Sequence, residues 1–317
     1  MSLLSIRDLV VRYRGHSGAT VTAVAGCDLD VEEGQIVALV GESGCGKSSL
    51  GKAAVGLIRP AAGSVTFDGE PVEPLGQRAR PAAQRRLQMV FQDPFSSLNP
   101  RRRIADLIGD GLRVSELHGG RQLSVGECLE RVGLSAGIAD RFPHQFSGGQ
   151  RQRIAIARAL AAQPRCIVAD EPISALDASA QASIANLLVS LVDDLKVGLL
   201  FISHDLSIVR RIADITTVMY LGRVVETAPS EPLWRAPLHP YSAGLIGAIT
   251  EPDGRGRMPA DLPGDVPDPA APPPGCRFHP RCPIAIDRCS VEVPERRLLG
   301  PGRTAACHLA EPVAAFV

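Results

Sequence analysis

A glycine-rich segment between an apolar run and a helix-forming stretch constrains this chain most strongly. Residues 41–48 read Gly-Glu-Ser-Gly-Cys-Gly-Lys-Ser, the complete pattern G-x-x-x-x-G-K-[ST]. Its glycines allow the backbone to turn tightly and to point successive N–H groups at a phosphate. The apolar run 36–40 predicts a buried strand before the loop, and residues 47–58 predict a helix after it. The pattern therefore predicts a phosphate-binding loop in an α/β fold.

The residues of this loop have separate expected roles. We expect Lys47 to reach the β- and γ-phosphate oxygens of a nucleotide, and the Ser48 hydroxyl to hold Mg²⁺. The other loop residues expected to surround the phosphates are Gly41, Ser43, Gly44, Cys45, Gly46 and Ser49. The alternative is a glycine-rich turn that matches by coincidence, and the flanking strand and helix disfavour it.

An acidic pair supplies the second half of this chemistry. Four apolar residues at 166–169 run directly into Asp170 and Glu171. This pattern predicts a buried parallel strand that carries Asp170 to the Mg²⁺ ion. Glu171 is then placed to accept a proton from an attacking water molecule. An adjacent Asp-Glu pair is more often a solvated loop, but here Pro172 ends a buried strand at once, which favours the catalytic interpretation.

A second glycine motif follows the loop by about a hundred residues. Residues 146–150 read Phe-Ser-Gly-Gly-Gln, and residues 148–162 predict a helix that begins inside the motif. The two glycines leave the first backbone amides of this helix uncovered, so its N-terminus is suited to an anion. The helix also carries three arginines. Such a basic run can indicate nucleic-acid binding, but an exposed helix face is the simpler interpretation here.

Together these motifs resemble the ATP-hydrolysing subunits of ATP-binding-cassette (ABC) transporters, over residues 1 to about 250. The resemblance implies that Tyr13 stacks on adenine, that Gln92 contacts Mg²⁺ and the attacking water, and that His204 contacts the γ-phosphate. It implies catalysis by Lys47, Glu171 and His204, and Mg²⁺ binding by Ser48, Gln92 and Asp170. A second subunit would complete the site, with the interface residues Ser147, Gly148, Gly149, Gln150 and Asp177.

The same resemblance implies the architecture. We expect an α/β cassette with a mixed-sheet core, an antiparallel β subdomain and a helical subdomain at about 93–160. Apolar alternation predicts strands at 3–12, 21–31, 35–40 and 63–68, and residues 101–140 are expected to be helical, with a capping box at Ser124 and Glu127. The expected domains are the cassette at 1–250, a Pro-rich linker at 251–275 and a small cysteine-rich C-terminal module at 276–317.

Composition limits the functions that are open to the chain. Its 34 basic and 34 acidic residues give a formal net charge of zero, which provides no electrostatic case for a nucleic-acid partner. Apolar runs of about five residues are far too short to cross a bilayer, and the N-terminus lacks the pattern of a secretion signal. We therefore expect a soluble, intracellular protein. The abundance of Ala, Gly, Arg and Pro is typical of a GC-rich bacterial genome.

Four of the eight cysteines lie in the last 42 residues, with the spacing C-x5-C-x6-C-x17-C. This segment has too few apolar residues to fold on a core of its own. A reducing compartment disfavours disulfides, and zinc would more commonly use a C-x2-C pair. We expect a [4Fe–4S] cluster, with zinc and unligated thiols as the alternatives. The expected ligands are Cys276, Cys282, Cys289 and Cys307. Because a Pro-rich linker precedes them, we expect their role to be structural rather than catalytic.

The cysteine segment also narrows the family. Residues 275–283 resemble the C-terminal extension of the ATPases of oligopeptide and dipeptide importers, and so do residues 91–100 and 237–242. Residues 147–154 and 170–177 resemble the second, F-type ATPase of such importers. The resemblance implies peptide import at the cytoplasmic face of a bacterial membrane. Its implied partners are a paralogous ATPase subunit, two transmembrane permease subunits and an extracytoplasmic substrate-binding protein, and it implies no nucleic acid.

Several alternatives remain open at this point. Related transport systems import nickel or oligosaccharides. A soluble cassette ATPase of DNA repair or translation would share the nucleotide site, although a long coiled-coil insertion or a second cassette is not evident in this sequence. A redox regulator with a degenerate cassette would not need the intact site. For membrane docking, the resemblance indicates a groove at residues 92–103, with Phe95, Leu98 and Ile104 as candidate lining residues and the arginines at 101–103 at its rim.

Overall fold

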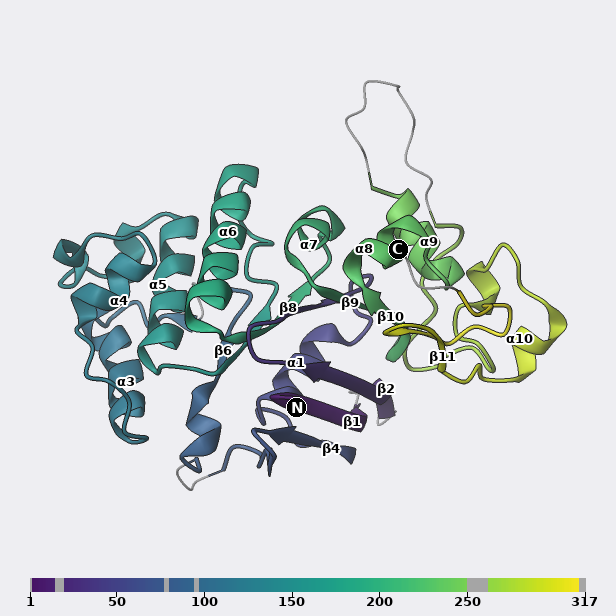
Figure 1. Cartoon of the computed structure of the whole chain (residues 1–317), viewed down its shortest axis with the longest axis horizontal. Helices are drawn as coiled ribbons and strands as arrows, with labels where there is room; N and C mark the ends of the chain where they lie inside the picture. Colours follow the sequence, from purple (N-terminus) through teal and green to yellow (C-terminus); the bar gives the residue numbers. More distant parts are fainter. Residues whose placement is uncertain (1, 15–19, 77–79, 94–96, 250–261, 314–317) are drawn as a thin grey trace.

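The computed structural model describes residues 2–14, 20–76, 80–93, 97–249 and 262–313. In these residues it contains a four-stranded antiparallel sheet in the order β2-β1-β4-β5 and an eight-stranded mixed sheet in the order β11-β12-β10-β9-β3-β8-β7-β6. Figure 1 shows the two sheets in the middle of an elongated molecule, with helices α3–α5 at one end and the C-terminal segment at the other. This arrangement places the expected cassette core between two peripheral parts.

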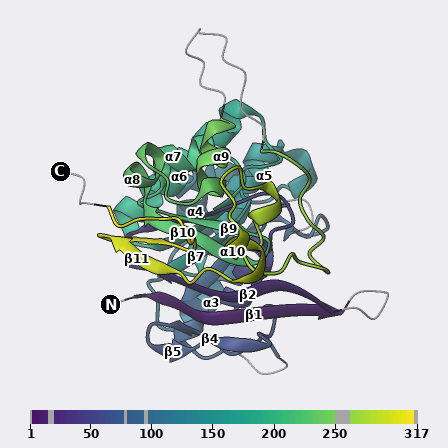
Figure 2. The same ribbon diagram turned by 90° about the vertical axis from the view of Figure 1, so that its right-hand side faces the viewer.

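The antiparallel sheet comprises β1 (Leu4–Arg14), β2 (Thr20–Val31), β4 (Ala62–Phe67) and β5 (Glu70–Pro71). Alternate apolar residues of β1 are buried, as expected for a strand with one face on a core. The hairpin between β4 and β5 turns at Asp68 and Gly69, which both have positive φ. That conformation is the one that Asp-Gly turns favour. Figure 2 shows β1 and β2 running beneath the mixed sheet.

The mixed sheet forms the centre of the fold. Its central parallel strands are β3 (Ile36–Val40), β8 (Gly198–Ser203), β7 (Cys166–Asp170) and β6 (Leu87–Val90). Every residue of β3, β7 and β8 is buried, which explains their continuous apolar runs. Next to β3 lies β9 (Ile215–Tyr220), which is parallel to it. Beyond β9 lies β10 (Arg223–Pro229), which is antiparallel to β9.

Helices cover the mixed sheet on both faces. Helix α1 (Lys47–Ala54) follows β3, and α6 (Ala178–Leu195) and α7 (Leu206–Ile212) follow β7 and β8. Helix α1 packs so closely on the sheet that a Cβ at Gly51 would lie 2.5 Å from Ile202. The short helices α8 (Ser230–Arg235) and α9 (Pro240–Gly247) follow β10.

The expected helical stretch at 101–140 is interrupted in the structure. The expected helical stretch at 101–140 forms α3 (Ile104–Glu116) and α4 (Val125–Arg131), separated by a non-helical connection. Gly119 has φ +74° in that connection, a conformation that ends a helix. The predicted capping box at Ser124 and Glu127 is present at the start of α4. Helix α5 (Gly148–Ala161) packs against α3 and α4.

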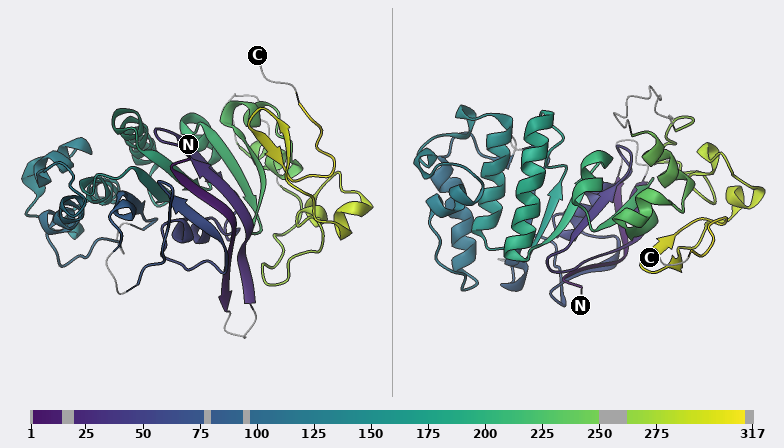
Figure 3. Two further views of the ribbon diagram at one scale, coloured as in Figure 1. Left: turned by 60° about the horizontal axis from the view of Figure 1, so that its bottom comes forward. Right: turned by 45° about the horizontal axis from the view of Figure 1, so that its top comes forward.

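The C-terminal segment lies directly on the cassette. It contains α10 (Asp287–Val291), β11 (Arg297–Gly300) and β12 (Arg303–Ala305), and β12 pairs with β10 to extend the mixed sheet. The Phe278 side chain is fully enclosed by Tyr220, Tyr241 and His239. Figure 3 shows this segment at the end opposite the helical subdomain. Of the expected linker, residues 262–275 contain neither helix nor strand, and its earlier part lies outside the described residues.

Candidate nucleotide-binding site

The predicted phosphate loop connects β3 to α1. A Cβ at Gly41 would lie 2.1 Å from the carbonyl oxygen of Met219, and one at Gly46 would lie 2.1 Å from that of Ala23. Neither position therefore accepts a side chain. Gly44 has φ +78° with open space around it, so its requirement is one of backbone conformation. Two of these glycines, Gly41 and Gly46, are required because neighbouring backbone comes close to them, and the third, Gly44, is required by its positive φ.

Lys47 lies inside this loop and is 4% exposed. Its Nζ atom donates hydrogen bonds of 2.7 Å to the carbonyl of Gly41 and 3.0 Å to the carbonyl of Glu42. These contacts hold the ammonium group next to the backbone amides that begin α1. Amides and ammonium together form an environment suited to phosphate.

Ser48, in the first turn of α1, is in contact with Asp170, the last residue of β7. The Ser48 hydroxyl donates a hydrogen bond of 2.8 Å to the Asp170 carboxylate. Burial raises the pKa of Asp170 above its ordinary value, an effect that the Ser48 hydrogen bond opposes. A divalent cation at this position would favour the ionised carboxylate, and hydroxyl and carboxylate oxygens are ligands that Mg²⁺ accepts. The two predicted Mg²⁺ ligands are thus in contact.

Glu171 brings together two further predicted residues. The Gln92 side chain, after β6, donates a hydrogen bond of 3.0 Å to its carboxylate. The Nδ1 atom of His204, after β8, lies 3.3 Å from the other carboxylate oxygen. Glu171 has φ +44° and its backbone N–H donates to Ile202. The ends of three adjacent parallel strands therefore converge on one carboxylate.

Lys47, Ser48, Gln92, Glu171 and His204 line a cavity of about 680 Å³, large enough for a nucleotide, whereas Asp170 contacts Ser48 from behind this lining. Its lining comprises Ala23, Ser43, Gly44, Gly46, Lys47, Ser48, Ser49, Gln92, Glu171, Ser174, Ala175 and His204. Sequence reasoning missed Ala23, because its place depends on β2 passing over the loop, and it treated 174–177 only as an interface. Tyr13 is 40% exposed, and its hydroxyl donates a 3.0 Å hydrogen bond to Ser49, at the start of α1.

The second glycine motif lies elsewhere in the chain. Ser147 is the N-cap of α5, where its hydroxyl and the Gln150 side chain form a reciprocal capping box. Asp177 caps α6 in a similar way. None of the described residues that line the nucleotide cavity belongs to the motif at 147–150. A chain on its own therefore does not bring this helix N-terminus to its own phosphate loop.

The four C-terminal cysteines line one small cavity, together with side chains that include His239, His279 and His308. All eight cysteines of the chain are free thiols. Burial raises the pKa of Cys276 and Cys282. Within the described ranges, no three His, Cys, Asp or Glu side chains are arranged to hold a metal ion. The structure thus brings the four predicted ligands together without showing a metal site, and the [4Fe–4S] cluster and its zinc alternative remain predictions.

The prediction that Leu98 and Ile104 line a docking groove is wrong. Leu98 and Ile104 are buried in the main core, and Phe95 lies outside the described residues. Arg102 pairs with Asp110 rather than standing free at a rim. A groove of about 330 Å³ lies instead on the other side of β6, where α3 and α5 meet the sheet. It is lined by Val55, Leu57, Leu75, Arg80, Leu87, Gln88, Met89, Phe91, Asp110, Gly111, Val114, Arg158 and Ala159.

In the parts of the chain that the structure describes, no helix combines the length and apolar character that crossing a bilayer requires.

Known proteins resemble this chain over nearly its whole length. Residues 24–174 match the family described as ABC transporter, and residues 225–289 match the oligopeptide/dipeptide transporter C-terminal region. The "Probable peptide ABC transporter ATP-binding protein y4tS" of Sinorhizobium fredii is 45% identical, over 99% of this chain and 92% of that protein. The "Putative oligopeptide transport ATP-binding protein YkfD" of Bacillus subtilis is 45% identical, over 98% and 96%.

A solved structure agrees with this likeness. A dimeric, post-hydrolysis ATP-binding cassette bound to ADP and phosphate matches with a TM-score of 0.62 and 28% identity, over 72% of this chain and 98% of that one. The chain belongs to the ATP-binding subunits of ABC transporters, in the oligopeptide/dipeptide family, and is an ATP-hydrolysing enzyme.

Proposed function

We propose that this chain is the ATPase subunit that powers the import of peptides through a membrane ABC transporter. The observation that carries the proposal is an intact nucleotide site in a chain that aligns from end to end with proteins named for peptide transport. The oligopeptide/dipeptide C-terminal region supports the same substrate class. Nickel and oligosaccharides are the alternative cargoes, and a soluble cassette uncoupled from transport is the alternative role.

The geometry assigns each group a part in hydrolysis. Glu171 polarises the attacking water, and Gln92 and His204 hold the carboxylate from both sides. Lys47 and His204 would bind the γ-phosphate, while Ser48, Gln92 and Asp170 would hold Mg²⁺, an ion that can neutralise negative charge on phosphate oxygens. Tyr13 stacks on the adenine ring. Because Lys47, Ser48, Gln92, Glu171 and His204 line the same 680 Å³ cavity, a nucleotide bound there would meet them together.

A second ATPase subunit completes the site in this proposal. Ser147 and the N-terminal amides of α5 would face the γ-phosphate held by the partner subunit, where the positive end of the helix dipole favours its charge. Asp177 would cross the same interface. The similarity of 147–154 and 170–177 to the F-type ATPase supports a paralogous partner and therefore a heterodimer.

The groove beside β6 is the proposed docking site for each permease subunit. Its occupant would be a short amphipathic helix from a cytoplasmic loop of the permease. Leu57 and Leu75 are exposed there, and Asp110 and Arg158 supply polar groups. The groove includes Phe91, the residue before Gln92. A movement of the docked helix would therefore reach Glu171 through Phe91, Gln92 and one hydrogen bond.

The remaining parts of the proposal concern assembly. The chain would lie at the cytoplasmic face of a bacterial membrane, with two permease subunits and an extracytoplasmic peptide-binding protein. The four thiols that line one cavity support a [4Fe–4S] cluster on Cys276, Cys282, Cys289 and Cys307, with zinc as the alternative.

Uptake measurements test the cargo. A host strain that lacks this chain should lose the uptake of labelled di- and oligopeptides, and the wild-type gene should restore it while Lys47→Ala should not. Nickel and oligosaccharide uptake should be unchanged in all three strains. Loss of nickel or oligosaccharide uptake with normal peptide uptake would replace the proposed cargo. Normal uptake of all three would favour a soluble ATPase.

A further inference from the structure

The cysteine-rich segment touches the phosphate loop through one side chain. Arg281, the residue before Cys282, donates hydrogen bonds of 2.7 and 3.1 Å to the two carboxylate oxygens of Glu42. Glu42 is the second residue of the phosphate loop, and 239 positions separate the two partners. The expectation that the Pro-rich linker isolates the cysteines from the nucleotide site therefore needs correction.

This ion pair is held in a fixed geometry. The Arg281 side chain is 4% exposed and that of Glu42 is 24% exposed. The Nε atom of Arg281 also donates a 2.9 Å hydrogen bond to the carbonyl of Pro263, and its guanidinium lies over the Tyr220 ring. A two-pronged arginine–carboxylate contact fixes orientation as well as distance, and lysine cannot reproduce it.

The same loop residue connects Arg281 to catalysis. The carbonyl oxygen of Glu42 accepts a hydrogen bond of 3.0 Å from Nζ of Lys47, and its backbone N–H donates one of 2.9 Å to the Tyr241 hydroxyl. Glu42 is thus fixed at its side chain, its amide and its carbonyl at once. A change in the Glu42 side chain would move a carbonyl that holds the phosphate-binding ammonium.

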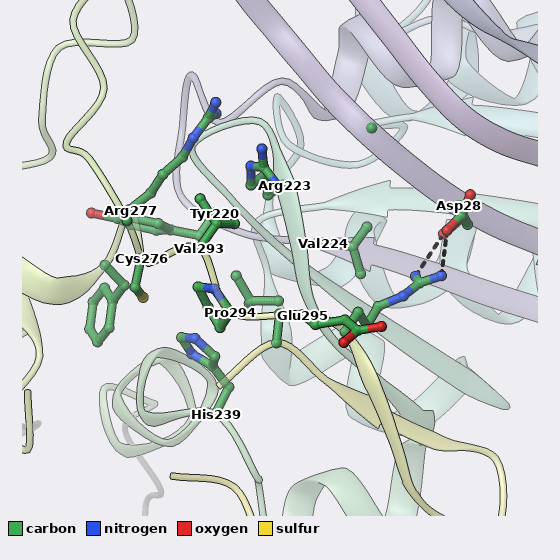
Figure 4. Close-up of a pocket in the computed structure, with 16 residues that line it drawn as sticks. Asp28, Tyr220, Arg223, Val224, His239, Cys276, Arg277, Val293, Pro294 and Glu295 are labelled. Atoms are coloured by element: carbon green, nitrogen blue, oxygen red, sulfur yellow. Dashed lines mark hydrogen bonds and ion pairs between the residues drawn. The ribbon is translucent and has the colours of Figure 1, made fainter. Parts of the chain in front are cut away.

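A second set of contacts connects the cysteine segment to the loop. Arg277 donates a hydrogen bond to the carbonyl of Leu221, in the turn between β9 and β10. In that turn, Gly222 donates from its backbone N–H a 2.8 Å hydrogen bond to the carbonyl of Cys45, in the phosphate loop. A cavity of about 270 Å³ lies beside these residues, and Figure 4 shows Arg277 and Asp28 on opposite sides of it. Arg296, which also lines the cavity, donates a hydrogen bond of 2.7 Å to the Asp28 carboxylate.

We infer that Arg281 is a positioning residue for the phosphate loop, through which the C-terminal cysteine segment sets the ATP affinity of this chain. The inference rests on the ATPase activity but not on the cargo or on a bound metal. Linkage makes the effect reciprocal, because a segment that stabilises the ATP-binding form of the loop is itself stabilised when ATP binds.

A double-mutant cycle on equilibrium ATP binding tests the inference in the full-length chain. Arg281→Ala and Glu42→Gln should each weaken ATP binding about five- to a hundredfold, the range of ordinary coupling between sites. The double variant should bind no more weakly than the weaker single variant, because the contact is already lost. Arg281→Lys should restore part of the affinity. A double variant whose loss of ATP affinity equals the product of the two single-variant losses would overturn the inference.

A matched control comes from the same segment. Arg288 and Glu292 form an exposed two-pronged pair that does not reach the phosphate loop. Arg288→Ala should leave ATP affinity unchanged, and a loss equal to that of Arg281→Ala would show a general effect on the segment and contradict a specific role. A wild-type chain that binds no ATP would contradict the nucleotide site itself. That outcome is distinct from a double-mutant cycle that shows no coupling between Arg281 and Glu42, which would contradict only the inference.

Hydrogen exchange supplies a readout that does not depend on activity. Binding of a non-hydrolysable ATP analogue should slow amide exchange across residues 276–289 in the wild-type chain. In Glu42→Gln, which leaves the cysteine segment unaltered, saturating analogue should no longer slow it. Equal protection in both chains would overturn the inference, even if Arg281→Ala failed to fold.

Discussion

The side-chain amide of Gln92 donates a hydrogen bond of 3.0 Å to the carboxylate of Glu171, across the ends of the adjacent strands β6 and β7. This contact joins the strand beside the proposed permease groove to the group that would activate water. It gives a physical basis for coupling between the membrane subunits and hydrolysis.

Glu171→Gln should lower ATP turnover about 10²–10⁴-fold, because it removes a proton acceptor from the reaction. ATP affinity should be nearly unchanged, since an amide of the same shape can keep its contacts with Gln92 and His204. Phosphate release and equilibrium nucleotide binding measure the two effects. Glu231→Gln, an exposed residue paired with Arg235, is the control and should leave both unchanged. Turnover of Glu171→Gln within a few-fold of wild type would refute its role as the base.

Ser147→Arg should reduce hydrolysis about 10²-fold or more, by removing a transition-state contact from the partner's site. ATP binding to the variant's own phosphate loop should survive. Because Ser147 also caps α5, the matched control is Ser124→Arg, which removes the equivalent cap of α4 at a similar cost of about 1 kcal/mol. Equal loss of activity in both variants would attribute the effect to helix stability. A monomer whose specific activity does not depend on protein concentration would contradict a shared site.

A cysteine in place of Leu75 should crosslink to the cytoplasmic loops of the permease subunits in the assembled transporter. Leu75 is half exposed at the groove beside β6, where the amphipathic helix is proposed to dock. Leu195→Cys, at the exposed end of α6, is the control and should not react with these loops. Crosslinks from position 195 alone would move the docking site away from the groove.

Protein purified without air should be brown and contain about four irons per chain, as expected for one [4Fe–4S] cluster on four thiolates. Cys282→Ser should remove the colour and make the C-terminal segment more sensitive to protease. The control variant Cys128→Ser, which changes a buried cysteine of the helical subdomain, should keep the brown colour. Colourless wild-type protein with one zinc per chain would identify the alternative metal, and protein with neither would leave the four thiols unligated.

The local parts of the site could be predicted because their signals lie within short stretches of sequence. The strand at 36–40, the loop glycines and the start of α1 all lie where their pattern indicates. Helix α1 ends at Ala54, earlier than the predicted residue 58, because Gly56 takes φ +74°. The break in the predicted helix at 101–140 has the same cause at Gly119, so both glycines were readable signals.

The long-range parts could not be predicted from such signals. The pairing of β12 with β10 and the contact of Arg281 with Glu42 join residues that are far apart in sequence. An arginine beside a cysteine gives no local indication of its partner, and a proline-rich stretch indicates only an extended chain. The resemblance indicates a surface groove lined by Leu98 and Ile104, but both side chains are buried in the main core, and sequence alone does not distinguish a buried apolar side chain from an exposed one.

ATP-driven uptake into vesicles tests the central claim most directly. Vesicles that contain the assembled transporter with this chain, supplied with the binding protein and ATP, should accumulate labelled peptide against its gradient. Vesicles that contain Glu171→Gln should bind ATP and accumulate no peptide. Peptide accumulation that continues undiminished with Glu171→Gln, while the wild-type chain hydrolyses ATP, would contradict the account.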